Sequence, residues 1–165
     1  MAEIKSSGSK RNFNTGAQRD ASVNKGRMDL VPLEIAAMLL DGDKTLFEIA
    51  YFINDGNKEH LLEAIKNSLE YIPQYENNIE TLILGVSLHY ENGAKVYGEN
   101  NWKFGMPLHV YIDSGTRHYL KARRGDTDED HHWAFVWNFM CAYWQLENGH
   151  EDLIDMEFPP VPKTA

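Results

Sequence analysis

Acidic and basic side chains recur at four-residue steps in the second half of the sequence. Glu91 is followed by Lys95, and Asp113 is followed by Arg117 and Lys121. Residues four apart lie on the same face of an α-helix, so each set places charges of both signs side by side. Carboxylates bind hard divalent cations, and neighbouring Lys and Arg side chains bind phosphate oxygens. The pattern therefore indicates a site for a metal-bound phosphate ligand, suited to attack of water on a phosphoanhydride.

A third group of acids precedes the last apolar segment of the chain. It consists of Asp126, Asp128, Glu129 and Asp130. Negative charge at a helix N-terminus is stabilised by the helix dipole, and a single Glu–Lys pair is often an ordinary surface ion pair. Each set thus has a structural explanation when it is taken alone. Three successive segments that each carry acids beside basic residues favour a shared site.

The stretch GAKVYGENNWKFGMP, residues 93–107, joins two of these charged segments. Its glycines and asparagines permit turns and left-handed backbone conformations, and Asn101 also offers amide donors and acceptors. Trp102 suits either a core position, which is the commoner role for a tryptophan after a turn, or a stacking platform for a base. We expect a turn that completes a phosphate site on one side and shapes a base pocket on the other.

Two polar residues interrupt the apolar segment near the C-terminus. His131 and Asn138 are seven residues apart, which places them on the same face of a helix. Each unpaired polar group on a buried face costs about 1–3 kcal/mol. Both side chains are therefore expected to have hydrogen-bond partners.

Apolar residues at three- and four-residue intervals predict an all-α helical bundle. No segment shows the sustained alternation of a strand. The expected helices cover residues 29–40, 45–56, 58–72, 79–97, 107–124 and 128–148, and Asp29 is the candidate N-cap of the first. The last segment is apolar on most sides and carries Trp133, Trp137 and Trp144, which is typical of a helix at the centre of a bundle or in a subunit interface.

Length and composition favour one soluble domain. The chain has 165 residues, 42% of them hydrophobic, and a formal charge of −9, which argues against binding to duplex nucleic acid. The single cysteine, Cys141, excludes an internal disulfide and favours a reducing compartment. No segment resembles a signal peptide or a membrane span. We expect one domain at residues 16–150, a flexible tail at 1–15 within a polar segment that extends to residue 26, and a C-terminal tail at 151–165.

Three blocks of sequence carry a resemblance to a known family. The blocks are GAQRD…NKGRMDLVPLE, GAKVYGENNWKFGMPL and YIDSGTRHYLKARRGDTDEDHHWAFVWN. In this order they resemble the phage-type dATP/dGTP diphosphohydrolases, a branch of the MazG-like all-α nucleoside triphosphate pyrophosphohydrolases. The resemblance covers residues 16–40 and 80–145, and residues 41–79 between them look like an inserted helical hairpin.

The resemblance implies an enzyme that hydrolyses purine deoxynucleoside triphosphates to the monophosphate and pyrophosphate. Its cofactor would be Mg²⁺ or Mn²⁺, held by acids on two facing helices. The chain would form a homo-oligomer, either a dimer or a tetramer. The single cysteine and the lack of a signal peptide or membrane span separately favour a cytoplasmic protein, in the host cell if the gene is carried by a phage.

The resemblance also implies roles for particular residues of this chain. The catalytic residues are Glu91, Glu129 and Asp130, and the metal ligands are these three together with Asp113. The substrate-binding residues are Arg19, Lys25, Arg27, Lys95, Asn101, Trp102, Arg117, His118, His131 and Asn138. Among them, the basic residues are expected to contact phosphates, with those of the N-terminal block closing over the triphosphate. Asn101, Trp102, His131 and Asn138 are expected to shape the base or sugar pocket.

One departure from the family pattern leaves a second function open. The superfamily pairs two acids three residues apart on each metal-binding helix, and Glu91 has no second acid at that spacing. This departure favours a catalytically inactive nucleotide-binding or assembly module on the same scaffold. A third possibility, a purely structural interaction protein, would leave the recurring basic and amide residues without a purpose. Turnover of a nucleotide would indicate the enzyme, and thermal stabilisation by a nucleotide without turnover would indicate the binding module. A purely structural protein would show neither.

Overall fold

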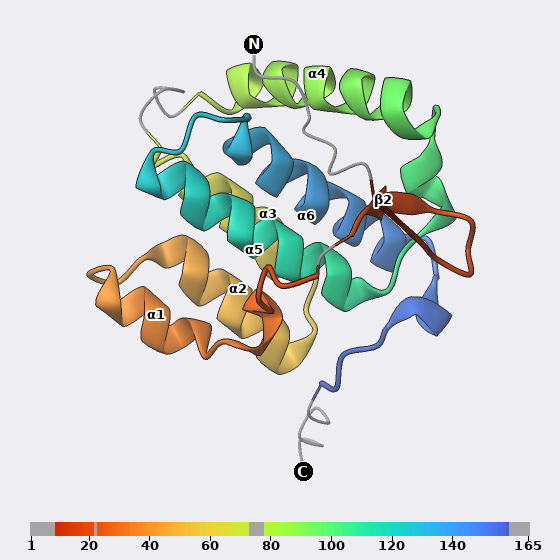
Figure 1. Ribbon diagram of the computed structural model, residues 1–165. Helices are drawn as coiled ribbons and strands as arrows, with labels where there is room; N and C mark the ends of the chain where they lie inside the picture. Colours follow the sequence, from red (N-terminus) through yellow and green to blue (C-terminus); the bar gives the residue numbers. More distant parts are fainter. Residues whose placement is uncertain (1–8, 22, 73–77, 159–165) are drawn as a thin grey trace.

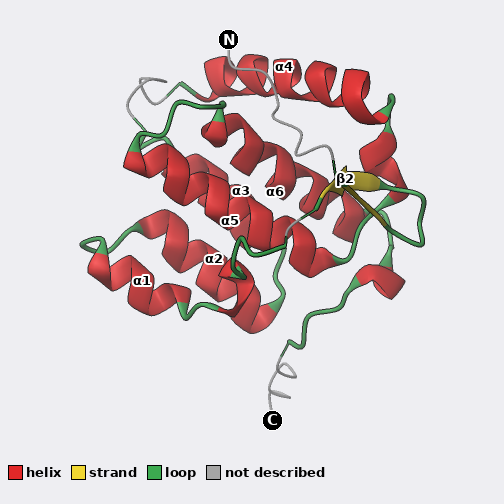
Figure 2. Cartoon of the chain, in the orientation of Figure 1, coloured by secondary structure: helices red, strands yellow, loops and turns green. Residues whose placement is uncertain are grey.

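The computed structural model describes residues 9–21, 23–72 and 78–158 and is mostly helical (Figure 1, Figure 2). The described part of the chain contains six α-helices and one two-stranded sheet. The helices are α1 Leu33–Leu39, α2 Lys44–Asp55, α3 Glu59–Ser68, α4 Ile79–Tyr97, α5 Leu108–Arg124 and α6 His131–Glu147. The short 3-10 helices are η1 Met28–Leu30, η3 Asn101–Phe104 and η4 Glu151–Leu153. The predicted all-α bundle is confirmed.

Helices α5 and α6 form the centre of the bundle. Figure 1 shows α4 along one side of this pair, and α1 and α2 along the other. In α6, the side chains of Phe135, Val136 and Phe139 are buried, which explains why this helix is apolar on most sides. Gly115 of α5 permits close packing, because a Cβ at this position would lie only 2.7 Å from Cε1 of Phe139. The last helix thus occupies the central position considered from the sequence.

Polar side chains mark the beginnings of two long helices. Asp43 precedes α2 and Asn78 precedes α4, and each side chain accepts a hydrogen bond from the backbone amide three residues later, at 2.7 Å and 2.8 Å. Such N-caps stabilise a helix by about 1 kcal/mol. The prediction of Asp29 as an N-cap is wrong, because this residue lies inside η1 and accepts hydrogen bonds from the Arg27 guanidinium. None of the described helices combines the length and apolar character needed to cross a membrane.

An N-terminal β-hairpin occupies part of the segment expected to be a tail and loop. Strand β1, Lys10–Asn12, pairs antiparallel with strand β2, Gln18–Asp20. These strands are short and polar, so they lack the apolar alternation that predicts a strand. The structure therefore differs from the predicted tail at residues 10–12. Residues 1–8 of that tail lie outside the described part.

Part of the predicted C-terminal tail also packs against the bundle. Leu153 of η4 is buried. The ring of Phe158 lies 5.6 Å from that of Phe52, edge to face, and Asp155 pairs with His109 at the start of α5. Residues 151–158 thus contribute to packing, and residues 159–165 lie outside the described part.

Helices α2 and α3 pack as the predicted helical hairpin, and a buried carboxylate joins them to α5. Asp43 is fully buried, and its Oδ2 accepts hydrogen bonds from the Tyr119 hydroxyl and the Arg123 guanidinium. Burial, and then the hydrogen bond to Asp43, raises the pKa of Tyr119. The same carboxylate therefore caps α2 and anchors α5. Residues 73–77 of the predicted insertion lie outside the described part.

Replacing Asp43 with alanine should lower the free energy of unfolding by about 3 kcal/mol. The change removes an N-cap and leaves the buried Tyr119 hydroxyl and Arg123 without their acceptor. Urea unfolding followed by circular dichroism measures the difference. The matched control is Lys44→Ala, which removes only an exposed pair with Glu70 and should change stability little. Equal effects of the two substitutions would contradict the anchoring role of Asp43.

A second buried polar pair joins α6 to α3. His132 Nε2 lies 2.8 Å from Ser68 Oγ, and both residues are buried. The Ser68 hydroxyl donates to the Ile65 carbonyl at 2.6 Å, so its oxygen is the acceptor for His132. Burial lowers the pKa of His132 from 6.5 to about 3. The folded protein therefore holds this ring in its neutral form over a wide pH range.

The neutral ring of His132 should make stability depend on pH. Its pKa is about 3 in the folded chain, against an ordinary value of 6.5, so the unfolded chain binds the proton first as the pH falls. The stabilisation is complete above pH 6.5 and is lost progressively as the pH falls towards 3. His132→Gln keeps a donor for Ser68 but does not titrate, so its stability should fall less over this window. Thermal unfolding at several pH values measures both proteins, and an identical pH dependence would contradict the assignment.

Candidate functional site

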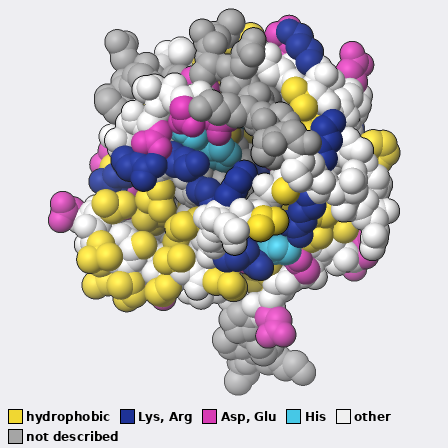
Figure 3. Space-filling model, viewed as in Figure 1, with side chains coloured by type: hydrophobic (Ala, Val, Ile, Leu, Met, Phe, Trp, Pro, Cys, Tyr) yellow, Lys and Arg dark blue, Asp and Glu magenta, His cyan; other side chains and the backbone are white. Residues whose placement is uncertain are grey.

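A cavity of about 540 Å³ opens between α4 and α5. Its walls also include residues of α6, strand β2 and the turn that follows α4. On the face shown in Figure 3, Lys and Arg side chains gather around a hollow, with His and acidic side chains beside them. Charged and apolar groups from distant parts of the sequence thus meet in one site.

Most of the predicted site residues line this cavity. Those that line it are Arg19, Lys25, Glu91, Asn101, Trp102, Asp113, Arg117, His118, Glu129 and Asn138. Arg27, Lys95, Asp130 and His131 are not among the lining residues. The structure therefore brings together residues from all three blocks of the resemblance. Several of these residues have hydrogen-bond partners that the sequence does not indicate.

Arg19 of β2 brings a positive charge to the cavity wall. Its guanidinium donates to Ser114 Oγ at 2.9 Å and to Asn138 Oδ1 at 3.3 Å, and Met106 Sδ lies 3.9 Å away. These partners are all neutral, and no carboxylate of the described residues forms an ion pair with Arg19. Burial lowers the pKa of Arg19, although the nearby Tyr111, Tyr97, Cys141 and Asp113 act in the opposite direction. A shielded cation held by neutral partners is suited to bind an anion.

The turn after α4 fixes the hairpin beside the cavity. The backbone amide of Gln18 donates to Asn101 Oδ1, and Asn101 Nδ2 donates to the Gln18 carbonyl, both at 3.0 Å. The Tyr97 hydroxyl donates to Asp20 at 2.9 Å. The Asn101 amide, predicted to shape a base or sugar pocket, therefore holds the backbone of β2 and through it positions Arg19.

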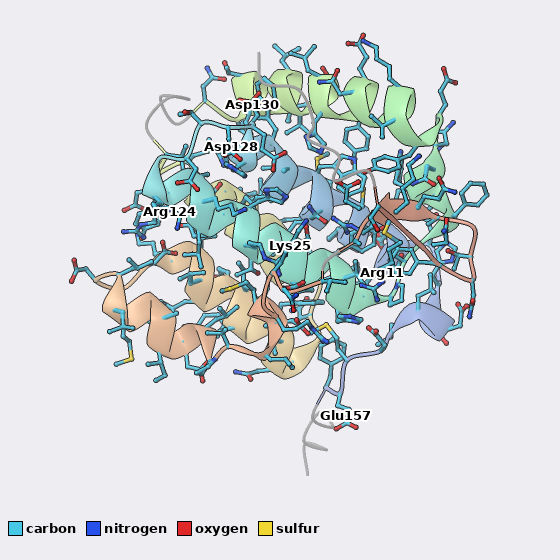
Figure 4. The ribbon with its side chains drawn as sticks, in the orientation of Figure 1. Arg11, Lys25, Arg124, Asp128, Asp130 and Glu157 are labelled. Atoms are coloured by element: carbon cyan, nitrogen blue, oxygen red, sulfur yellow. The ribbon has the colours of Figure 1, made fainter. Side chains whose placement is uncertain are left out.

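Asp113, which is buried, and Arg117, which is partly buried, form an ion pair that holds the segment before α1. Arg117 donates to Asp113 at 2.5 Å and to the carbonyls of Lys25 and Gly26 at 3.3 Å and 2.9 Å. Asp113 also accepts from the Met28 amide at 2.6 Å. The sequence predicts a metal ligand and a phosphate contact here. In the structure, the pair positions Lys25, which lines the cavity and lies in front of α5 in Figure 4.

Three of the predicted site residues, Glu91, Lys95 and Arg27, form ion pairs with residues close to them in the sequence. Glu91 lies at the cavity wall, but its side chain is 62% exposed and pairs with Lys95 at 3.7 Å. This is the ordinary surface pair considered from the sequence. Arg27 pairs with Asp29 at 2.7 Å. Neither Lys95 nor Arg27 reaches the cavity, so neither is placed to close over a ligand in this structure.

Two histidines and a glutamate meet where α5 passes the start of α6. The Nδ1 atoms of His118 and His131 are 2.9 Å apart, and Glu129 Oε1 lies 3.5 Å and 3.4 Å from them. His131 Nε2 lies 2.6 Å from Asp128 Oδ1. Burial, and then the neighbouring His131, lowers the pKa of His118 well below 6.5, so its ring is neutral. The expectation that His131 and Asn138 are both paired is confirmed, because Asn138 also donates to the Ala134 carbonyl.

Two groups among the described residues have donor atoms close enough to hold a metal ion. They are His118–Glu129–His131 and Asp126–Asp128–His131, each with its donors within 4.8 Å of one another. Glu91, Asp113 and Asp130 belong to neither group, so the four predicted acidic ligands do not form one cluster. Asp130 occupies the N-cap position of α6, and Figure 4 shows it with Asp128 at the turn that leads into this helix.

Aromatic side chains form an apolar part of the wall. The ring of Trp102 lies edge-on to those of Tyr90 and Trp144, at 5.7 Å and 5.0 Å, so Trp102 packs against the core with part of its side chain on the cavity wall. Trp137 and His89 also line the cavity, with their rings 5.7 Å apart. Burial, and then the positive charge of Arg19, lowers the pKa of His89 to about 4. This part of the wall is therefore uncharged.

Several lining residues are absent from the predicted set. His89, Gly93 and Tyr97 follow one another at four-residue steps along α4 and all line the cavity. Their shared helix face is a signal that the sequence contains. Gln18 and Ser114 carry no comparable signal, because they reach the cavity only through the packing of the hairpin against α5.

Gly93 leaves open space beside the backbone of α4. Glycine in a helix interior is less stable than alanine by about 1 kcal/mol. The φ of Gly93 is not positive, and a Cβ added there would meet no described atom within 4 Å. Neither backbone strain nor close packing therefore explains this glycine. It widens the cavity, where a ligand can approach the helix.

Comparison with known proteins identifies the family of this chain. The family model described as dATP/dGTP diphosphohydrolase, N-terminal, matches residues 71–155, slightly more than half of the chain. The matched segment includes α4, α5 and α6, and it excludes the hairpin that carries Arg19. No curated protein and no solved structure matches the chain. The resemblance to the dATP/dGTP diphosphohydrolases is thus confirmed, and the chain belongs to the family defined by the N-terminal domain of these enzymes.

Proposed function

We propose that this chain hydrolyses purine deoxynucleoside triphosphates, dATP or dGTP, to the monophosphate and pyrophosphate. The observation that carries the proposal is the Arg19 guanidinium, which lies on the cavity wall with neutral hydrogen-bond partners. A triphosphate supplies the negative charge that this group lacks. The description of the family, which names dATP and dGTP, supports the substrate class.

The composition of the cavity suits the parts of a nucleotide. Lys25, Lys121 and Arg19 provide positive charge for the phosphates, and Tyr90 and Trp137 provide aromatic surface for the base. The volume of about 540 Å³ lies in the ordinary range of small-molecule sites. A ligand with an anionic end and an aromatic end would therefore find complementary groups.

The proposed reaction breaks the bond between the α- and β-phosphates by attack of water. A divalent cation, predicted from the resemblance to be Mg²⁺ or Mn²⁺, would neutralise phosphate charge and lower the pKa of its bound water. Among the predicted catalytic acids, Glu129 is the best placed to hold the cation with one carboxylate oxygen and to act on its bound water with the other. It lines the cavity and its side chain is 17% exposed, against 62% for Glu91. Arg19, oriented by Ser114 and Asn138, would hold phosphate oxygens.

The purified chain should release monophosphate and pyrophosphate from dATP or dGTP, and Arg19→Gln should lower kcat/KM by roughly 10–100-fold. This range corresponds to loss of hydrogen bonds to a charged group, worth about 1.5–3 kcal/mol. Assays with each deoxynucleoside triphosphate and either Mg²⁺ or Mn²⁺, resolved by ion-exchange chromatography, measure both quantities.

The matched control is Arg27→Gln. Arg27 belongs to the same N-terminal segment but pairs with Asp29 and does not line the cavity, so this variant should retain activity. Thermal stabilisation by nucleotide without product would favour the alternative, an inactive nucleotide-binding module. Absence of both product and stabilisation with every nucleotide would reject both functions.

Gly93→Leu should weaken nucleotide binding without weakening the fold. The new side chain would enter the cavity, whereas the helix propensity at this position would rise. Isothermal titration with a nucleotide and thermal unfolding measure the two effects. Ser87→Leu is the matched control, because Ser87 is an exposed residue of α4 outside the cavity. Wild-type affinity in Gly93→Leu would show that the ligand does not use this space.

Assembly into a homo-oligomer, a dimer or a tetramer, is part of the proposal. Leu30, Ile35, Met38 and Leu39 of η1 and α1 are each more than half exposed. Figure 3 shows hydrophobic side chains gathered over the region of α1. Large exposed apolar patches are typical of protein interfaces, which supports an assembled form.

A further inference from the structure

Three donor atoms at the edge of the cavity have the separations of ligands around one metal ion. Nδ1 of His118, Nδ1 of His131 and Oε1 of Glu129 are 2.9, 3.4 and 3.5 Å apart. A point in their plane that is equidistant from all three lies about 1.9 Å from each, and moving it about 0.9 Å out of the plane gives about 2.1 Å, an ordinary metal–ligand distance. One ion can therefore contact all three atoms without movement of the backbone.

Asp128 holds His131 in an orientation suited to coordination. The 2.6 Å contact between Asp128 Oδ1 and His131 Nε2 places the proton on Nε2, so Nδ1 presents its lone pair. Histidines that bind metals commonly donate their other ring N–H to a carboxylate in this way. Without an ion, the neutral His118 ring donates from Nδ1 to His131. Coordination requires that this proton move to Nε2 of His118 and that the two rings turn until both Nδ1 lone pairs face the ion.

We infer that His118, His131 and Glu129 form a site for a transition-metal ion of the class of Mn²⁺, Co²⁺ or Zn²⁺. Imidazole nitrogen suits these ions, whereas Mg²⁺ prefers oxygen ligands. Two histidines and one carboxylate on one side of an ion leave other coordination positions open. His118 and Glu129 line the cavity, so water or a phosphate oxygen can reach those positions. Participation of the ion in hydrolysis rests on the proposed function, but its binding rests on the donor geometry alone.

The neighbouring group of Asp126, Asp128 and His131 is a weaker candidate. It would use Nε2 of His131, and that nitrogen already contacts Asp128. Asp126 is in addition paired with Arg124. Asp128 is therefore better explained as the residue that orients His131 than as a ligand.

Metal titration of the full chain tests the inference. After treatment with a chelator, calorimetric titration with Mn²⁺, Co²⁺ or Zn²⁺ should show one strong site, and excess Mg²⁺ should not compete for it. Bound Co²⁺ should also show visible absorption bands that report nitrogen ligands. His118→Asn and His131→Asn should each remove the strong site. Asp128→Ala removes the acceptor that orients His131 and should lower the affinity roughly 10–100-fold.

The matched control is His60→Ala. His60 lies 2.7 Å from Glu48 and 2.9 Å from Asp55 near the surface, so it offers histidine and carboxylate donors outside the cavity. This variant should keep the strong site. Wild-type affinity in both His118→Asn and His131→Asn, or loss of the site in His60→Ala, would overturn the inference. Equal affinity for Mg²⁺ would do so as well. If a histidine variant unfolds, the Co²⁺ spectrum of the wild type decides.

The same measurements separate this inference from the proposed function. A strong site that depends on the two histidines, in a chain that hydrolyses no nucleotide, would retain the site and reject the reaction. Hydrolysis supported by Mg²⁺ in a chain without such a site would retain the reaction and reject the inference.

Discussion

The close contact between α5 and α6 is the constraint on which the rest of the structure depends. Gly115 lies against Phe139 with no room for a Cβ, so the two helices approach more closely than larger side chains would allow. Because of this approach, one residue from each helix reaches Arg19, and farther along the same seam His118 meets His131. The position of the cavity cation and that of the histidine pair thus follow from one packing contact.

The N-terminal hairpin shows how a polar segment with little to bury becomes part of a site. Its strands pair with each other, and the Asn101 side-chain amide forms two hydrogen bonds with the backbone of Gln18. The backbone polar groups of the strands are therefore satisfied without an apolar core. Neutral hydrogen bonds offset the cost of shielding Arg19 and leave its charge available to a ligand. Since the family match begins at residue 71, this cation reaches the family's helices from outside the matched segment.

Carboxylates that look equivalent in the sequence have different surroundings in the fold. Glu91 faces solvent beside Lys95, Asp113 is buried and holds a loop through Arg117, and Glu129 lies partly shielded beside two histidines. Helical spacing determines which residues share a face, but it does not determine what that face meets. Their chemical roles therefore depend on packing, because solvent exposure and existing partners decide whether an oxygen can bind a ligand.

By itself, the sequence determined the all-α class and the approximate bounds of helices α2 to α6, and most of the site residues predicted from it line the cavity. Apolar periodicity and turn residues act within short segments, so they can be read without knowledge of the fold. Only the tertiary structure decided that Arg19 enters the cavity while Arg27 does not, and that His131 joins His118. These outcomes depend on how closely helices and strands that are distant in the sequence pack against each other. A local sequence pattern does not determine the distance between such elements.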